Sequence, residues 1–214
     1  MNFEYFLKEI IKIKHLSLLG EISHSKLSPP YRLELSQQIK EKVKSVKKAA
    51  VMTLFYPNNN NETMLVLILR KTYKGVHSSQ VGFPGGKPEK IDINMEATAL
   101  RETEEEIGVE SKEIDIIKEL SKIYIPPSNF DVQPFIGISK NKLHFKKQDE
   151  EVEDIIEIKI EQILNHQNII QTKVKTSYSI DVEVPAFKIN NHIIWGATAM
   201  ILSELKDLIS QLDI

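Results

Sequence analysis

The stretch GFPGGKPEKIDINMEATALRETEEEIGV, Gly82 to Val109, decides the fold. Its second half predicts a helix from about Met95 to Ile107, with Asp92 or Asn94 as the N-cap and Gly108 as the C-cap. A run of apolar residues typical of a buried strand comes before it, followed by a loop rich in Gly and Ser. Strand, loop and helix in this order are a common frame for phosphate chemistry.

Three carboxylates are expected on one side of this helix, because Glu102, Glu105 and Glu106 stand at positions i, i+3 and i+4. Like charges at this spacing repel by a few tenths of a kcal/mol per pair, roughly, so a divalent cation that neutralises them would explain the cluster. Mg²⁺ and Mn²⁺ prefer such hard oxygen ligands. Leu100 and Ile107 lie on the opposite side and would anchor the helix.

The residues around the acids support a site. Gly85 and Gly86 let the backbone approach a metal ion or a phosphate closely. Arg101 precedes Glu105 by four residues and can hold its carboxylate in place. Three consecutive glutamates alone are more typical of a solvated acidic face. Combined with the double glycine and the arginine, they favour a metal site for diphosphate hydrolysis.

The segment resembles the Nudix box, in which Gly, five residues, Glu, seven residues and Arg-Glu-aliphatic-x-Glu-Glu-x-Gly-aliphatic follow one another. Here Gly86 begins the box and Arg101–Val109 ends it. Asp92 stands in for the first Glu, one extra residue precedes the arginine, and Thr103 replaces an aliphatic residue. The first two departures, and the Phe-Pro-Gly-Gly sequence at Phe83–Gly86, are similar to the coenzyme A pyrophosphatase branch of the family.

Further similarities to that branch extend the resemblance over Ala49–Leu205; they are Leu69-Arg70, Pro127-Ser128, Pro134-Phe135 and Ile194–Ala199. Two positions differ from the branch. Its upstream motif has an Arg and a Gly where this chain has Gly75 and Ser79. These differences bear on specificity for coenzyme A and not on the hydrolytic chemistry.

The resemblance implies a role for each residue of the box. Glu102 and Glu106 would bind the metal, and Glu105 would be a further ligand or the group that activates water. The carbonyl group of Gly86 would be another ligand, and Arg101 would orient the cluster.

Two acids outside the helix have implied roles as well. Asp92 would take the structural or electrostatic role of the first Glu in the box. Glu151, in the acidic run Asp149–Asp154, would place one more carboxylate near the metal. An exposed acidic loop explains this run equally well.

Cations near the glycine loop are candidates for binding substrate phosphates, namely Arg70, Lys74 and Lys87. Three further residues receive no role, because a polar loop or a packed core explains each of them as simply: His77, Phe130 and Trp195.

Composition limits the other possibilities. Lys and Arg total 28 and Asp and Glu total 30, so the net charge of −2 predicts no general affinity for nucleic acid or an anionic membrane. The chain has no Cys, which excludes disulfides and thiolate chemistry and favours a cytoplasmic location. The first 19 residues carry charges among their apolar positions, unlike a signal peptide or a membrane span.

Two parts are expected along the chain: an N-terminal helical extension, 1–48, and a Nudix hydrolase domain, 49–214. The extension would contain an amphipathic helix, whose core-facing stripe is Phe3, Phe6, Leu7, Ile10 and Ile11, and a second helical stretch from Tyr31 to Lys48. The domain would be an α/β (α+β) Nudix fold, a mixed β-sheet sandwiched between helices. The extension could form a homodimer interface or cover the substrate pocket.

The predicted function is Mg²⁺- or Mn²⁺-dependent hydrolysis of a diphosphate bond in a small nucleotide-derived substrate. The resemblance implies coenzyme A or acyl-coenzyme A. ADP-ribose or another nucleoside di- or triphosphate derivative is the alternative. A Nudix-fold binding domain without catalysis is a third possibility, although it is disfavoured because the helix carboxylates are present.

Overall fold

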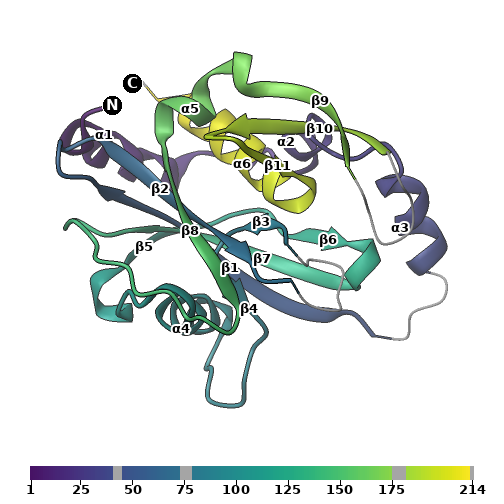
Figure 1. Ribbon diagram of the computed structural model, residues 1–214, viewed down its shortest axis with the longest axis horizontal. Helices are drawn as coiled ribbons and strands as arrows, with labels where there is room; N and C mark the ends of the chain where they lie inside the picture. Colours follow the sequence, from purple (N-terminus) through teal and green to yellow (C-terminus); the bar gives the residue numbers. More distant parts are fainter. Residues whose placement is uncertain (41–44, 73–78, 175–181, 213–214) are drawn as a thin grey trace.

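A mixed β-sheet forms the centre of the protein in a computed structural model that describes residues 1–40, 45–72, 79–174 and 182–212 (Figure 1). Eight strands of the described residues belong to this sheet, with the path β3-β2-β1-β7-β5 and with β4, β6 and β8 paired beside it. Strands β1 and β7 are parallel, and the other pairs are antiparallel. These strands are β1 (Lys47–Pro57), β2 (Thr63–Arg70), β3 (Val81–Gly82), β4 (Gly85–Gly86), β5 (Asp115–Glu119), β6 (Ile123–Ile125), β7 (Phe130–Ile138) and β8 (Val152–Lys159).

A smaller antiparallel sheet and the helices surround the centre. The small sheet has the order β11-β10-β9, with β9 at Ile169–Val174, β10 at Val182–Ile189 and β11 at His192–Trp195. The α-helices are α1 (Phe3–Ile10), α2 (Glu21–Ser25), α3 (Arg32–Lys40), α4 (Met95–Ile107), α5 (Ile160–Leu164) and α6 (Gly196–Ile209). Short 3-10 helices are η1 (Ile11–His15), η2 (Ser111–Glu113), η3 (Pro126–Ser128) and η4 (His166–Asn168).

Side chains alternate between the two faces of the central sheet, as the two-residue period of a strand requires. In β1, Met52 and Leu54 face one core, and Phe55 faces the other. Helix α4 covers the first face, whereas α1 and α6 lie on the other side of the sheet (Figure 1). The expectation of a mixed sheet sandwiched between helices is confirmed.

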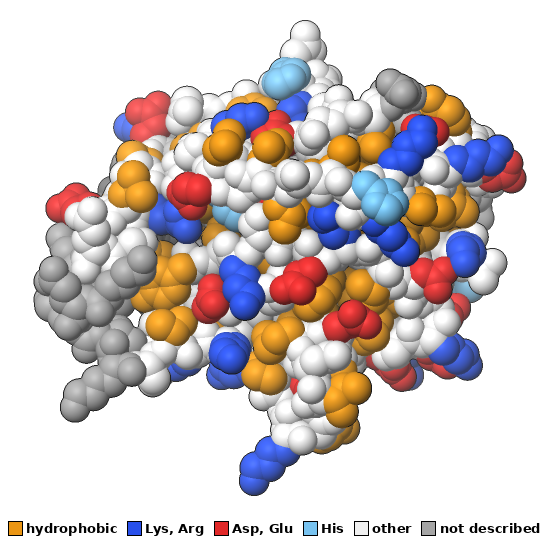
Figure 2. Space-filling view, turned by 180° about the vertical axis from the view of Figure 1, so that it is seen from behind, with side chains coloured by type: hydrophobic (Ala, Val, Ile, Leu, Met, Phe, Trp, Pro, Cys, Tyr) orange, Lys and Arg blue, Asp and Glu red, His pale blue; other side chains and the backbone are white. Residues whose placement is uncertain are grey.

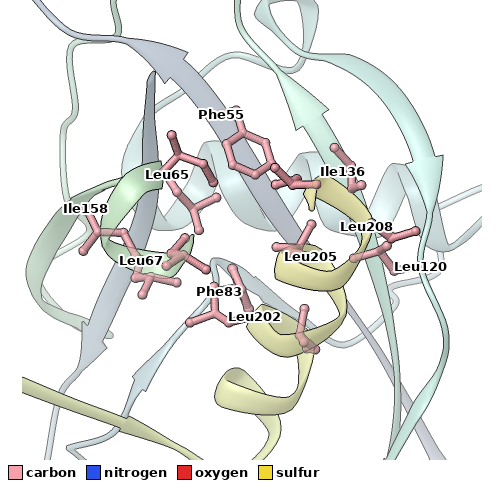
Figure 3. Packing of buried hydrophobic residues seen from close by; sticks show 14 of the residues in the cluster. Phe55, Leu65, Leu67, Phe83, Leu120, Ile136, Ile158, Leu202, Leu205 and Leu208 are labelled. Atoms are coloured by element: carbon pink, nitrogen blue, oxygen red, sulfur yellow. The ribbon is translucent and has the colours of Figure 1, made fainter. Parts of the chain in front are cut away.

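The larger core lies between the sheet and α6. Leu202, Leu205 and Leu208 of α6 belong to one cluster with Phe55 and Leu67 of the sheet, and Leu208 lies beside Leu120 (Figure 3). All six side chains are buried. Because apolar burial is the main stabilising term in folding, the C-terminal helix is an integral part of the domain.

The N-terminal helix joins the same core. Phe6 and Ile10 of α1 are fully buried, and the ring of Phe6 lies 5.0 Å from that of Phe55. The prediction for Ile11 is wrong, since this side chain is 48% exposed. At Ile11 the chain changes from an α-helix to a 3-10 helix. The next buried residue after Ile10 is therefore Ile13, three residues later.

The second predicted N-terminal helix is shorter than expected. Helix α3 covers Arg32–Lys40, residues 41–44 lie outside the described residues, and Lys47 and Lys48 already belong to β1. The parallel partner of β1 explains this difference, because Lys47 pairs with Phe130 of β7. Such a long-range pairing overrides the local helical pattern of a lysine-rich run.

Several other predictions agree with the structure. The sequence predicts a hairpin of two strands, Ala49–Pro57 and Thr63–Lys71, and the structure forms it as β1 and β2, with Phe55 paired to Leu65. It predicts a second hairpin from Tyr178–Phe187 and His192–Trp195, which is formed by β10 and β11, although residues 178–181 lie outside the described residues. Sequence reasoning missed β5 and β9 and the very short strands β3 and β4.

The surface mixes both signs of charge. On the face shown in Figure 2, acidic and basic side chains are interspersed among apolar ones, in agreement with a net charge of −2. None of the helices in the described residues has the length and apolar character needed to cross a membrane.

Candidate active site

Helix α4 begins and ends where the sequence predicted. The side chain of Asn94 accepts a hydrogen bond from the backbone N–H of Ala97, which caps the first turn. Gly108 ends the helix in the left-handed region, with φ of 74°. On the apolar side of the helix, Ile107 is fully buried, and Leu100 is partly buried against the same core. The two ends and this apolar side fix the rotation of α4, so Glu102 and Glu106 face β4.

The double glycine lies directly against the acidic side of α4. Strand β4 pairs with β1, where Gly86 lies opposite Ala50. A Cβ atom on Gly86 would lie 2.4 Å from the carboxyl group of Glu102, and one on Gly85 would lie 2.2 Å from the carbonyl oxygen of Ala50. Neither position has room for a side chain, so the carboxylate of Glu102 lies directly on the backbone of β4.

Glu106 is the buried member of the acidic cluster. Its Oε1 accepts a hydrogen bond from Nη1 of Arg70 at 2.8 Å, and its Oε2 accepts one from the backbone N–H of Gly85 at 2.8 Å. Burial raises the pKa of Glu106 to about 7, although Arg70 and the N–H of Gly85 favour the charged form. A buried carboxylate with a raised pKa is a common feature of functional sites.

Arg101 organises the other carboxylates. Its guanidinium group donates to Glu105 Oε2 at 2.7 Å, to Glu102 Oε1 at 3.2 Å and to both carboxylate oxygens of Asp92. It also donates to the carbonyl oxygen of Lys87 at 2.9 Å. One arginine therefore connects the loop before α4 with two glutamates on its surface.

Asp92 lies in the position expected of a structural acid. It accepts hydrogen bonds from Arg101, from the hydroxyl group of Thr98 and from the backbone N–H of Glu89. The bonded Arg101 lowers the pKa of Asp92 to about 2. The loop that contains Asp92 connects β4 to α4 and projects away from the rest of the protein (Figure 1). The side chains of Ile91 and Ile93 in this loop are exposed.

Glu102 is under the influence of several neighbouring charges. Burial raises its pKa, Arg101 opposes this effect, and the charges of Glu105 and Glu151 raise the pKa further. Glu151 is exposed on the turn before β8, and its charge acts on Glu102. The segment before this turn lies beside α4, since the backbone N–H of Gln148 donates to the carbonyl oxygen of Glu106 at 3.0 Å. Glu104 points elsewhere, since it accepts hydrogen bonds from the backbone and the hydroxyl group of Ser111.

Thr103, which stands where the Nudix box has an aliphatic residue, is buried. Its hydroxyl group donates to the carbonyl oxygen of Ala99 at 2.6 Å, one turn earlier. The helix itself satisfies the polar atom, so the methyl group can pack in the core.

The oxygen atoms suit a hard divalent cation. Glu102, Glu105 and Glu106 form an acidic cluster with Gly86 beside it, and Arg70 and Arg101 donate hydrogen bonds to their carboxylates. Within the described ranges, no three acidic or histidine side chains are grouped as ligands of one metal ion. A cation would compete with Arg70 and Arg101 for carboxylate oxygens, and the donor set fits it.

The three predicted phosphate-binding cations have different positions. Arg70 uses Nη1 for Glu106 and Nη2 for the carbonyl oxygen of Gly85, so it holds the acidic cluster. Lys74 lies outside the described residues, as do Gly75 and His77. Lys87 is exposed beside Gly86, with its ammonium group 5.8 Å from the centre of the Phe130 ring.

Sequence reasoning missed Lys47. Its ammonium group lies 5.6 Å from the centre of the same Phe130 ring. The parallel pairing of β1 with β7 brings Lys47 beside Phe130, which is 83 residues later in the chain, so no local signal could indicate this contact. Two cations therefore gather at one aromatic ring near Gly86.

A cavity of about 290 Å³ adjoins the acidic cluster. Arg70, Gly85 and Gly86 line it and contact the carboxylates on their other side. Phe130 and Trp195, which received no role from the sequence, also line this cavity. A concave, largely apolar space beside convergent polar groups is typical of a ligand-binding site.

Comparison with known proteins identifies the class to which this fold and site belong. Residues 46–175 match the NUDIX domain. The chain is 30% identical over 149 residues to a protein named uncharacterized Nudix hydrolase NudL from Yersinia pestis (strain Pestoides F), with 70% of this chain and 74% of the relative aligned. A Nudix hydrolase NudL from Yersinia pseudotuberculosis matches equally well. The chain belongs to the Nudix family, and the prediction of a Nudix hydrolase is confirmed.

Solved structures support the fold independently. A Nudix hydrolase from M. smegmatis, RenU, aligns with a TM-score of 0.54 and 12% identity, over 78% of this chain and 88% of that one. An Ap4A hydrolase from C. elegans aligns with a TM-score of 0.52 and 14% identity, over 78% and 99% of the two chains. At these identities the likeness concerns the fold alone.

Proposed function

We propose that this protein hydrolyses a diphosphate bond in coenzyme A or an acyl-coenzyme A, with Mg²⁺ or Mn²⁺ as the cofactor. Nudix hydrolases generally use divalent metal ions. The observation that carries the proposal is the arrangement of Glu102 and Glu106, one helical turn apart on α4, against the glycine backbone of β4. A side chain at Gly86 would displace the carboxylate of Glu102 from this place.

Glu102 and Glu106, with the carbonyl group of Gly86, are the proposed ligands. A divalent cation bound there would neutralise charge on the phosphate oxygens and lower the pKa of a bound water. Glu105 is the most exposed of the three glutamates, with 56% of its side chain accessible. It is a further ligand or accepts the proton of the attacking water, and Arg101 holds it at 2.7 Å in either role.

Glu151 is proposed as an additional acid of the site. Its charge acts on Glu102 from a segment of the chain other than α4. Arg101 is proposed as a positioning residue, since it donates hydrogen bonds to Asp92, Glu102 and Glu105.

Lys87 and Lys47 are proposed to bind the phosphate groups of the substrate. Each reaches the ring of Phe130 at the edge of the site, and neither has an ion pair within the described parts of the chain. Arg70 is proposed to approach the substrate through the side of its guanidinium group that lines the cavity. Lys74 lies outside the described residues, and its role in binding phosphate stays a prediction from the sequence.

Coenzyme A is preferred over other diphosphates because of the Phe-Pro-Gly-Gly sequence and the longer box with Asp92. ADP-ribose and other nucleoside di- or triphosphate derivatives are the alternative substrates. A cytoplasmic location and a homodimer are further proposals that follow from the composition and the N-terminal helices.

A substrate panel tests the proposal. The full-length protein with Mg²⁺ or Mn²⁺ is incubated with coenzyme A, acyl-coenzyme A, ADP-ribose, dinucleoside polyphosphates and nucleoside triphosphates, and the products are identified by mass. We expect adenosine 3',5'-bisphosphate and a phosphopantetheine from coenzyme A. Preference for another member of the panel would assign a different substrate and leave the proposed diphosphate hydrolysis in place. No turnover of any member would favour a binding domain.

A further inference from the structure

Part of the wall of the cavity beside the acidic cluster comes from segments of the chain outside the matched NUDIX domain. Pro29 and Leu35 come from the segment before that domain, and Trp195 and Ile201 come from the segment after it. The remaining wall belongs to β6, β7 and the strands next to α4. The end of the cavity near the acidic cluster is therefore formed by the part of the chain that matches the family. The far end is formed in part by the segments before and after it.

The lining is mainly apolar, and several polar side chains that reach it already have protein partners. The hydroxyl group of Thr198 donates to the carbonyl oxygen of Val81 at 2.9 Å. The hydroxyl group of Tyr124 donates to Asn129 Oδ1 at 3.0 Å. Arg70 donates to Glu106 and Gly85. Arg32 also reaches the lining, with a buried Nε that has no hydrogen-bond partner. Apart from this atom, the side chains just named offer no unused group to the edge of a nucleobase, so they suit an apolar chain better than a base.

The two ends of the cavity thus have different chemistry. Lys47 and Lys87 lie near Gly86, where the charged part of a substrate is held. Aliphatic and aromatic side chains, among them Ile125, Trp195 and Ile201, line the rest. A ligand that matches both ends carries a diphosphate at one end and an apolar arm at the other.

We propose that the cavity binds the acyl end of a substrate arm, and that the segment from Pro29 to Leu35 limits the length of the acyl chain. This inference rests on the proposed function, since the arm is attached to the diphosphate that the site cleaves. It also makes acyl-coenzyme A a better substrate than coenzyme A itself. Leu35 is the specificity-determining residue at the outer wall.

The chain provides its own reporter for this binding. Trp195 is the only tryptophan, and it lines the cavity, so its fluorescence reports on the environment inside. S-acetyl-, S-hexanoyl- and S-decanoyl-pantetheine, which contain no phosphate, are titrated against the full-length protein. We expect a change in emission and a Kd that falls roughly threefold for each added methylene until the cavity is full.

Two leucines of α3 give a matched pair of variants. Leu35 lines the cavity, whereas Leu33 is 66% exposed on the same helix. Leu35→Gln is expected to weaken binding of S-decanoyl-pantetheine about tenfold, because an amide buried without a partner costs free energy. Leu33→Gln is expected to leave this Kd unchanged, and both variants should bind S-acetyl-pantetheine like the parent protein.

The outcomes separate this inference from the proposed function. A Kd independent of chain length, or equal effects of the two leucine variants, would overturn the inference even if coenzyme A is hydrolysed. Binding of adenosine in competition with S-decanoyl-pantetheine would assign the cavity to the base and overturn it as well. Tight binding of long acyl chains, sensitive to Leu35→Gln only, would support it even if the protein cleaved no diphosphate in the panel.

Discussion

Glu106 combines burial with two short hydrogen bonds, and its charge is required for the proposed metal site. Replacing it by Gln keeps a similar shape and one carbonyl acceptor for Arg70 or Gly85, but removes the charge. We expect Glu106→Gln to lower metal-dependent turnover by on the order of a thousandfold, or about 4 kcal/mol of transition-state stabilisation. Steady-state kinetics on the best substrate of the panel measure this loss.

Glu104→Gln is the matched control for that variant. Glu104 lies on the same helix, but its carboxylate bonds to Ser111 rather than to the site. Its replacement should leave kcat within a factor of two, roughly, because exposed positions away from the chemistry have small effects. If Glu106→Gln retained full activity, or if both variants lost activity equally, the assignment of the metal site to this side of α4 would be wrong.

Asp92 and Arg101 form the ion pair that fixes the loop before α4, and this pair predicts a dependence of stability on pH. Arg101 lowers the folded-state pKa of Asp92 to about 2 from its ordinary value of 3.8. A lowered pKa means that the stabilisation is complete above the ordinary value and is lost as the pH falls toward the folded-state value. Asp92→Asn should cost about 2 kcal/mol near neutral pH, since it removes a charge-assisted pair of hydrogen bonds.

Urea unfolding of the parent protein and Asp92→Asn across the pH range measures this effect. The difference between their free energies of unfolding should shrink as the pH falls from 3.8 toward 2. A difference that stays constant over this range would mean that the carboxylate charge of Asp92 does not stabilise the folded state.

At the scale of elements, the close contact between β4 and α4 depends on the absence of a side chain at Gly86. Gly86→Ala would place a methyl group 2.4 Å from the carboxyl carbon of Glu102, so the carboxylate must move. Gly82→Ala is the control, because its nearest neighbours would lie at 3.7 and 3.9 Å, an ordinary contact. We expect Gly86→Ala to weaken Mn²⁺ binding by at least about tenfold and Gly82→Ala to leave it unchanged.

Calorimetric titration with Mn²⁺ and thermal unfolding of both glycine variants make this comparison independent of turnover. Equal Mn²⁺ affinities in Gly86→Ala and Gly82→Ala would show that Glu102 does not bind the metal from its place beside β4. A loss of affinity accompanied by unfolding would be recognised in the melting curve.

Elements with local signals could be predicted from the sequence. Helix α4 follows from its cap at Asn94, its stop at Gly108 and the spacing of its acids, which all lie within a few residues of one another. The grouping of Arg101 with Glu105 follows in the same way from one helical turn. The structure agrees with these local predictions.

Contacts that join distant segments could not be predicted. The ion pair of Arg70 with Glu106 spans 36 residues, and the sequence indicated only a cation near the loop. The meeting of Lys47 with Phe130 needs the parallel pairing of β1 with β7. Register and strand order determine such contacts, and neither leaves a signal within one segment.

At the scale of the whole molecule, segments from both ends of the chain close the domain. Glu204 of α6 is fully buried and accepts hydrogen bonds from Ser121 and from the backbone of Gly20, and its Oε2 lies 3.3 Å from Nε2 of His24. The neighbouring Asp207 accepts from Ser23 at 2.5 Å. Removing one member of such a buried network leaves the others unsatisfied, so α2 and α6 are held together strongly.

The N-terminal helix gives the sharpest test of whether the first 48 residues are separable from the domain. Ile10 is fully buried in the main core, whereas the next residue, Ile11, is 48% exposed. Ile10→Ala should lower the free energy of unfolding by about 3 kcal/mol through lost burial and a residual cavity. Ile11→Ala should change it by less than about 0.5 kcal/mol, and urea unfolding of the two variants measures both values. Equally small effects would mean that α1 is a detachable extension; the expected difference would mean that a chain shortened to the matched NUDIX domain lacks part of its core.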